Sequence, residues 1–228
     1  MSNILVCGDI HGRIEAVHEL YRVAYDTNTH VVFVGDIVDS YGRTLEEEFE
    51  CMNLVLGLAE DGLATLIYGN HELSYLYPHM ICSRYDRDMA HWFKENRARI
   101  EKNFVSHTWV GDYLVTHAGL GRLHYEFAGA TSVSDYFDNH TDRHHDIGFY
   151  RGGSAPRGGI YWSDYRSDFV PIPGVKQIFG HTQVPIILQD YPDNYCVDCL
   201  EKSPTVLSVD TDTNATSTLT LLLEEHDD

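Results

Sequence analysis

Basic residues and long apolar runs are both scarce in this chain of 228 residues. Its 16 lysines and arginines stand against 35 aspartates and glutamates, which gives a formal net charge of −19. Such a balance repels polyanions, so duplex DNA, RNA and anionic membranes are poor partners. No apolar segment approaches the roughly 20 residues of a membrane span. These absences favour a soluble globular protein, and we expect one domain over residues 1–228.

Cysteine is too scarce and too scattered for a disulfide framework. The five cysteines are an odd number with wide gaps between them. Cys196 and Cys199 have CxxC spacing, but no second CxxC completes a four-ligand zinc site. We expect two ordinary thiols beside a strand, with redox or metal chemistry as the alternative. The first motif begins at residue 8 and leaves no room for a signal peptide, which favours a cytoplasmic protein.

Short apolar runs alternate with longer amphipathic stretches, and this alternation predicts βα units. Thr44 is a suitable N-cap for a helix because acidic residues follow it in the first turn. The predicted helices are 13–26, 44–60 and 86–102. The predicted strands are 4–7, 30–34, 64–68, 113–116, 176–179, 195–197, 205–209 and 216–223. The acidic tail 224–228 is expected to fray.

The segment 134–159 is polar and rich in glycine. It contains the run DNHTDRHHDIGFYRGGSAPRGG. A mobile surface loop is one interpretation of such a composition, and a substrate-facing loop is the other. The adjacent His144 and His145 lie within it, although neighbouring histidines rarely chelate one ion.

Five predicted strands end in residues that can bind a metal ion. The ends read LVCGDIHG, VVFVGDIVDS, TLIYGNHE, YLVTHAGL and KQIFGHT. In α/β sheets ligand sites lie at the carboxyl ends of strands, so these ends should converge on one crevice. Aspartate, asparagine and histidine together suit manganese, iron or zinc. A lone aspartate after a strand is usually a turn or cap residue, but five such ends are hard to explain in that way.

The spacing within the motifs predicts which side chains point together. In an extended segment residues i and i+2 face the same way, so Asp9 and His11 should hold one ion together. Asn70 and His71 are neighbours and should point apart, one to the metal and one to the substrate. The glycines beside them leave space for a phosphate to approach the backbone.

The order GDxHG, GDxxD, GNHE, HAGL and GHT resembles the calcineurin-like metallophosphoesterase superfamily. The GNHE and HAGL forms are most similar to its phosphoprotein phosphatase branch, including small bacterial and phage members and the symmetrical diadenosine tetraphosphatases. The resemblance runs from residue 8 to about residue 183. It implies an α/β fold, a four-layer αββα sandwich of two mixed β-sheets flanked by helices.

The resemblance also implies a site with two divalent metal ions. The implied ligands of the first ion are Asp9, His11 and Asp36. Asp36 would bridge to the second ion, which Asn70, His117 and His181 would complete. Manganese is the expected metal, with iron, zinc or nickel as alternatives.

The implied catalytic residues are His71 and Asp39. Two ions that share a hydroxide can supply the nucleophile and clamp the phosphoryl oxygens. His71 would act as the general acid that protonates the leaving alkoxide, and Asp39 would orient its ring.

The chain departs from the family at Ser40, where an arginine usually follows the last aspartate of the second motif. Serine cannot supply the forked guanidinium that binds phosphate oxygens. Arg43 lies three residues further on, and Arg166 resembles the family's second phosphate-binding arginine. Arg151 and Arg157 in the glycine-rich segment are weaker candidates.

We therefore expect a metal-dependent phosphoester hydrolase, in the first place a serine/threonine-type phosphomonoesterase. A dinucleoside polyphosphate hydrolase or phosphodiesterase is the enzymatic alternative, and a catalytically inactive phosphate-binding module is the alternative of another class. The expected partner is a phosphorylated protein or a small phosphoester, without membrane or nucleic acid. The sequence leaves the physiological substrate, the native metal pair and the oligomeric state open.

Overall fold

Two mixed β-sheets form the centre of the computed structural model, which describes residues 3–77, 80, 82–139 and 147–223. The first sheet has the spatial order β11 (Thr216–Thr220), β10 (Thr205–Asp210), β1 (Asn3–Cys7), β2 (His30–Phe33), β3 (Ala64–Ile67) and β4 (Phe104–Val105). The second has the order β5 (Thr108–Val110), β6 (Tyr113–Val115), β7 (Lys176–Phe179), β9 (Asn194–Cys196) and β8 (Leu188–Tyr191). Strands β1 to β4 pair in parallel, as do β6, β7 and β9, while the remaining pairs are antiparallel.

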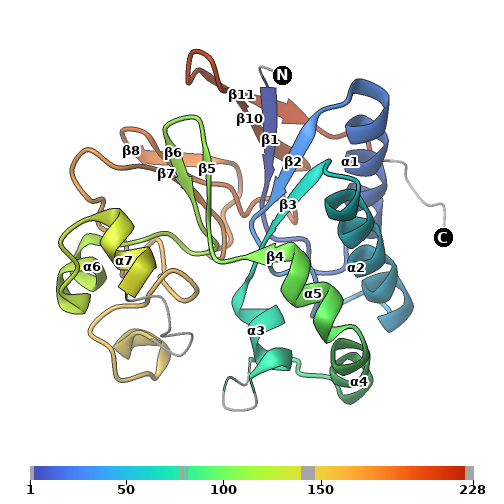
Figure 1. Cartoon of the computed structure of the whole chain (residues 1–228), viewed down its shortest axis with the longest axis horizontal. Coiled ribbons are helices and arrows are strands. Elements are labelled where there is room, and N and C mark those ends of the chain that lie inside the picture. The colour runs from blue at the N-terminus through green and yellow to red at the C-terminus, as the bar shows by residue number, and fades with distance from the viewer. Residues whose placement is uncertain (1–2, 78–79, 81, 140–146, 224–228) are drawn as a thin grey trace.

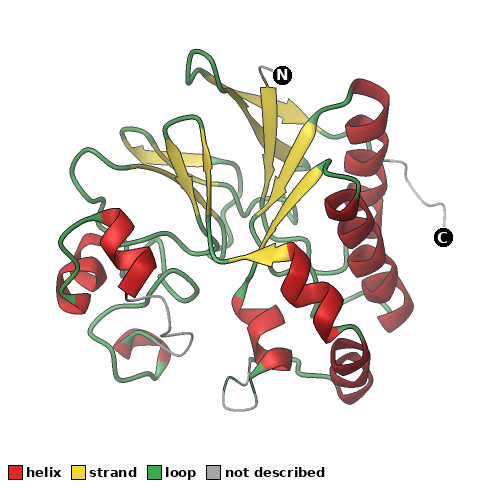
Figure 2. Cartoon of the chain, viewed as in Figure 1, coloured by secondary structure: helices red, strands yellow, loops and turns green. Residues whose placement is uncertain are grey.

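Helices cover the outer sides of the two sheets (Figure 2). The described helices are α1 (Ile14–Thr27), α2 (Leu45–Glu60), α3 (Asn70–Leu76), α4 (Arg87–Glu95), α5 (Arg97–Asn103), α6 (Arg122–Ala128), α7 (Val133–Asn139) and the 3₁₀ helix η1 (Phe149–Arg151). The pair α1 and α2 lies beside the six-stranded sheet, and α6 and α7 lie on the far side of the five-stranded sheet (Figure 1). The predicted αββα sandwich is thus confirmed. Within the described residues, no helix combines the length and the apolar character that crossing a membrane requires.

Strand β2 shows how the layers are held together. Val31 and Phe33 pack in the cluster formed with α1 and α2, while Val32 packs between the sheets with Val115 and Ile178. Both faces of the strand are therefore buried, as expected for a parallel strand between two layers. The side chains of the strand are used for packing on its two faces, so the site is formed by the loops that follow the carboxyl ends of the strands.

The predicted helices 13–26 and 44–60 correspond to α1 and α2, whereas α3, α6, α7 and η1 were not predicted. Thr44 caps α2 as predicted, and its hydroxyl accepts the backbone N–H of Glu47 in a capping box. The single helix predicted over 86–102 is wrong, because it is divided into α4 and α5 at Asn96, where ψ is 8°. The Asn96 side chain donates to the carbonyl oxygen of Trp92 at 2.9 Å, and such local bonds compete with helix continuation.

The segment 134–159 is more ordered than a simple loop. It begins within α7, and it contains η1 together with a β-bridge between Gly148 and Ala155. His144, His145 and the tail 224–228 lie outside the described residues. The last strand, β11, is shorter than the predicted 216–223.

The loops that follow β2 and β3 touch each other at two glycines. A Cβ at Gly35 would lie 2.4 Å from the backbone nitrogen of Gly69, and a Cβ at Gly69 would lie 2.1 Å from Oδ1 of Asp36. Gly35 also has a φ of 103°, which side chains rarely adopt. Glycine is therefore required where the Asp36 loop meets the start of α3.

This close approach predicts that Gly35→Ala destabilises the fold more than Gly62→Ala. Gly62 is a matched control, because its φ is also positive, at 75°, but nothing lies within 4 Å of its Cβ position. Both variants incur the cost of the left-handed backbone, and only Gly35→Ala adds a clash, which should cost about 1–3 kcal/mol more. Urea denaturation measures the free energy of unfolding. Equal losses in the two variants would contradict the contact between the loops.

Candidate metal centre

The polar residues predicted as ligands lie together where the two sheets meet. Asp9 and Asp36 follow β1 and β2, and Asn70 is the first residue of α3 after β3. His117 and His181 follow β6 and β7 of the other sheet. Both sheets therefore contribute the carboxyl ends of parallel strands to one site, as the sequence predicted.

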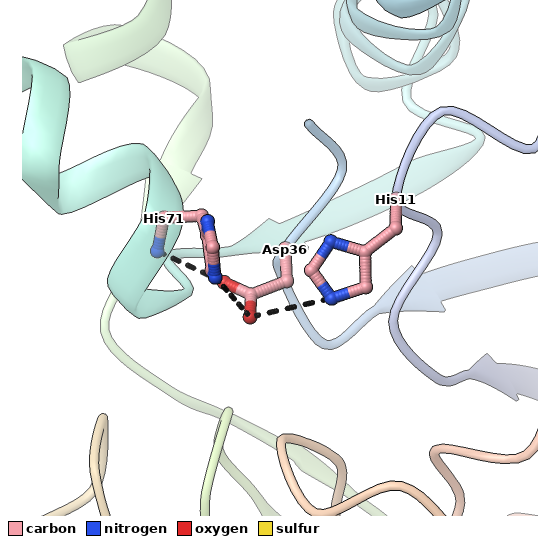
Figure 3. A group of neighbouring side chains, drawn as sticks. All are labelled: His11, Asp36 and His71. Atoms are coloured by element: carbon pink, nitrogen blue, oxygen red, sulfur yellow. Dashed lines mark hydrogen bonds and ion pairs between the residues drawn. The ribbon is translucent and has the colours of Figure 1, made fainter. Parts of the chain in front are cut away.

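Asp36 lies at the centre of this group. Its Oδ2 atom lies 3.4 Å from Nε2 of His117 and 3.9 Å from Nε2 of both His11 and His71. Figure 3 shows the rings of His11 and His71 on either side of the Asp36 carboxylate. Two groups with the spacing of a metal site share this residue, one with His11 and His71 and one with His117 and His181.

Hydrogen bonds behind the histidines determine which ring nitrogen faces the site. Nδ1 of His117 lies 2.8 Å from the carbonyl oxygen of Val34, and Nδ1 of His11 lies 2.8 Å from that of Val38. A carbonyl only accepts, so each Nδ1 carries the proton. In the neutral rings, Nε2 then presents a lone pair to the site.

These lone pairs meet other acceptors. Nε2 of His117 lies 2.9 Å from Oδ1 of Asn70 and 3.1 Å from Nδ1 of His181, in addition to the Asp36 oxygen. Nε2 of His11 lies 4.0 Å from Oδ2 of Asp9. Acceptors that converge in this way need either a proton or a cation between them. Imidazole, carboxylate and amide donors suit divalent manganese, iron or zinc, so the residues present fit two such ions.

Electrostatics in the site also favour a cation. Burial, the charge of Asp198 and the charge of Asp36 together raise the pKa of Asp9 well above its usual range. Burial opposes ionisation of Asp36 as well, but the neighbouring histidines, His117 first among them, hold its pKa well below the usual range. Two buried carboxyl groups this close repel each other when both are ionised, and a divalent ion would remove that repulsion.

The backbone turns sharply at the site residues. His11, Asp36, Asp39 and His181 all have φ between 46° and 68°, a region that residues other than glycine rarely adopt. Asp9 and His11 therefore approach each other through a turn, and the extended geometry assumed from their spacing is wrong. Asn70 and His71 likewise begin a helix, so strand alternation does not determine their directions.

Glu72, a residue of the GNHE motif whose role sequence reasoning did not identify, holds the Asp36 loop. Its carboxylate is fully buried and accepts the backbone N–H groups of Asp36, Ile37 and Gly69 at 2.8, 2.7 and 2.9 Å. An acidic residue at the third position of a helix is the signal for such a role, because it can reach back to the N-cap.

His71 and Asp39, the predicted catalytic pair, are directly hydrogen-bonded. Nδ1 of His71 lies 2.6 Å from Oδ2 of Asp39. The hydroxyl of Tyr75, a second residue that sequence reasoning missed, donates to the other Asp39 oxygen. Burial lowers the pKa of His71, but the charge of Asp36 and the bond to Asp39 outweigh it and raise that pKa to about 9. The ring is therefore oriented with Nε2 toward the site.

Two cavities adjoin the site. The larger, of about 990 Å³, is lined by His11, His71 and Arg43 among others. The smaller, of about 260 Å³, includes Asp36 and Asn70 in its lining. The guanidinium of Arg43 is paired with Glu15 and lies 3.4 Å from Glu47.

Neither Arg166 nor the CxxC cysteines line the two cavities, and the cysteines are in neither group with metal-site spacing. The guanidinium of Arg166 donates to the carbonyl oxygen of Gln183, and Arg166 does not line either cavity. Cys196 and Cys199 are buried free thiols whose sulfurs lie 3.3 and 3.4 Å from the backbone oxygens of Thr182 and Thr205. Their arrangement agrees with the interpretation as ordinary thiols.

Comparisons with known proteins identify the family and the fold. The model of the calcineurin-like phosphoesterase family matches residues 2–197. Over 76 residues the chain is 40% identical to the serine/threonine-protein phosphatase SIT4 of Candida albicans, a stretch that covers 31% of this chain and only 24% of that protein.

Two solved structures share the fold at low sequence identity. A serine/threonine phosphatase of Saccharomyces cerevisiae with similarity to human phosphatase PP5 aligns with a TM-score of 0.60 and 18% identity, covering 100% of this chain and 82% of that chain. A putative diadenosine tetraphosphatase aligns with a TM-score of 0.54 and 17% identity, covering 96% and 93%.

The central position of Asp36 predicts that Asp36→Asn weakens metal binding at both sites together. Losing even a residue behind a ligand costs about 10–100-fold in affinity, so the loss here should be at least tenfold. Metal content after dialysis, measured by mass spectrometry, tests this. Asp39→Asn is the matched control, because it changes a buried carboxylate of the same site that lies outside the two groups. If the Asp36→Asn variant still binds both ions fully, Asp36 does not bridge them.

Proposed function

Because the chain belongs to the calcineurin-like phosphoesterase family, we propose that it is a phosphoric ester hydrolase, and that it hydrolyses phosphomonoesters of the serine/threonine phosphatase type. A phosphoserine or phosphothreonine protein is the first substrate class proposed. The main observation behind this proposal is that two groups with metal-ligand spacing share the Asp36 carboxylate. Membership of a hydrolase family favours an enzyme over an inactive phosphate-binding module.

The proposed ligands are the six residues expected from the sequence. Asp9, His11 and Asp36 would hold one ion; Asp9 lies outside both groups with metal-site spacing and is proposed because its Oδ2 lies 4.0 Å from Nε2 of His11. Asp36, Asn70, His117 and His181 would hold the other. Two divalent ions there would activate a water molecule and neutralise charge on the phosphoryl oxygens, with manganese as the first metal to test.

His71 is proposed as the general acid. Its Nδ1–H donates to Asp39, so the second proton sits on Nε2, the atom that faces the site. That proton is placed for transfer to the oxygen of a leaving alcohol. Asp39 is held in turn by the hydroxyl of Tyr75, and the backbone N–H of Asp86 donates to that hydroxyl at 3.1 Å. Tyr75 therefore fixes Asp39, and Asp39 in turn orients the ring of His71.

Arg43 is proposed as a cation at the wall of the substrate cavity. It lines the larger cavity beside Ser40, but Glu15 and Glu47 neutralise much of its charge. Arg166 is proposed at the rim, since it bonds to Gln183, which lines the same cavity.

Hydrolysis of a dinucleoside polyphosphate is the second candidate, and the larger cavity favours it. Besides Arg43, that cavity is lined by Arg13 and Lys202, which share Glu201 as their partner and offer two positive charges for further phosphates of an extended substrate. One panel of a phosphoserine peptide, diadenosine tetraphosphate and bis-p-nitrophenyl phosphate, assayed with manganese, separates the candidates. A preference for the phosphopeptide supports the first, and a preference for the dinucleotide supports the second.

The role of His71 predicts a loss that depends on the leaving group. His71→Asn should lower kcat for a phosphoserine peptide by about 10²–10⁴-fold, the usual effect of losing acid–base catalysis. The loss should be much smaller for p-nitrophenyl phosphate, because p-nitrophenolate leaves without a proton. Steady-state kinetics on both substrates measure the two losses. Equal losses on both substrates would show that His71 has another role.

A further inference from the structure

The smaller cavity contains a cation that the family resemblance does not assign. Arg151 lines it together with Asp36, Asn70 and His181. Among the lining residues of this cavity that the structure describes, Arg151 carries the only guanidinium. A charge in the same cavity as the proposed ligands is placed to meet a phosphate bound there.

Asp164 fixes the Arg151 side chain. Its Oδ2 atom lies 2.7 Å from Nη2 of Arg151. The other oxygen of Asp164 accepts the backbone N–H groups of Arg166 and Ser167 at 2.9 and 3.0 Å, so the carboxylate is itself held in place. A guanidinium has five N–H donors, so one bond to Asp164 leaves donors for a ligand.

The glycine-rich run IGFYRGG places this arginine. The backbone N–H of Phe149 donates to Ala155 at 2.8 Å, so the segment folds back on itself. A Cβ at Gly153 would lie 1.9 Å from the carbonyl oxygen of Ile147, and Gly152 has a φ of 81°. The glycines are therefore a steric requirement of a tight turn that ends at Arg151.

The other arginines are less suited to this task. Arg43 is paired with two glutamates, and Arg166 bonds to the backbone oxygen of Gln183, which lines the larger cavity and not the smaller one. The guanidinium of Arg84 stacks 3.9 Å over the ring of Tyr41, and Arg157 lies 3.9 Å from Asp168, and neither lines the two cavities.

We propose that Arg151 binds the oxygens of the phosphoryl group in place of the arginine that is missing at Ser40, with Asp164 as its positioning residue. This inference rests on the proposed phosphoesterase function. The cavity walls also include Ile147 and Trp162, while the Arg151 side chain is 34% exposed and so accessible to a phosphate that enters the cavity. A guanidinium binds two phosphate oxygens in parallel, which a lysine cannot do.

The test measures both catalysis and phosphate binding in the manganese-loaded protein. Arg151→Ala should lower kcat/KM for p-nitrophenyl phosphate about ten- to a hundredfold, and Arg151→Lys should restore it only in part. Calorimetry with inorganic phosphate should show a similar loss of affinity. Asp164→Asn should weaken phosphate binding less than Arg151→Ala, with metal content unchanged.

Arg122→Ala is the control, because Arg122 is an exposed arginine on α6 that pairs only weakly with Glu126, at 3.8 Å. Unchanged phosphate affinity and kinetics in Arg151→Ala would overturn the inference, as would a full effect in Arg166→Ala instead. Thermal unfolding checks that each variant is folded. If Arg151→Ala does not fold, the phosphate affinities of Arg151→Lys and Asp164→Asn test the inference in its place. If the unmodified protein hydrolyses no phosphomonoester, the proposed function is wrong. The difference in phosphate affinity between the unmodified protein and Arg151→Ala still tests the role of Arg151 separately.

Discussion

The buried carboxylate of Asp36 faces three imidazole rings, and the surrounding loops are arranged to hold it there. Removing a carboxylate from water is costly unless it is paired and hydrogen-bonded. Glu72 secures the Asp36 loop through three backbone N–H groups, yet it adds a second buried acid nearby. Burial and the charge of Asp36 raise the pKa of Glu72 to about 7. A divalent cation at Asp36 would neutralise part of this negative charge. The arrangement that is energetically unfavourable without metal therefore favours metal binding.

The architecture divides the site between the two sheets. The loops of the six-stranded sheet supply the carboxylates, the amide and His11, whereas those of the five-stranded sheet supply His117 and His181. The group of Asp36, His117 and His181 draws on both sheets, so that part of the site is assembled only when the apolar residues between the sheets are packed. Close contacts such as that between Gly35 and Gly69 bring the loops within reach of each other. The segment that carries Arg151 adds a third part, which belongs to neither sheet.

The sequence pointed to the proposed ligands through local patterns, which by themselves predicted only alternating strands and helices. Apolar strands followed by glycine and a polar residue are visible without a structure, and the αββα arrangement came from the resemblance that these motifs carry. Side-chain direction was less predictable. The turn between Asp9 and His11 depends on a left-handed backbone at His11, which spacing alone does not reveal. Glu72, Tyr75 and Asp164 were missed because each acts on a partner that only the fold brings near. The break at Asn96 was missed because a side-chain bond to Trp92 decides it.

The central claim is that one carboxylate joins two metal ions in a single site. Electron paramagnetic resonance of the manganese-reconstituted protein, combined with the metal count per chain, tests it most directly. Two manganese ions that share Asp36 should be magnetically coupled, so we expect two ions per chain and the multiline spectrum of a dinuclear centre. A single ion per chain, or two ions with the spectrum of isolated manganese, would contradict the account.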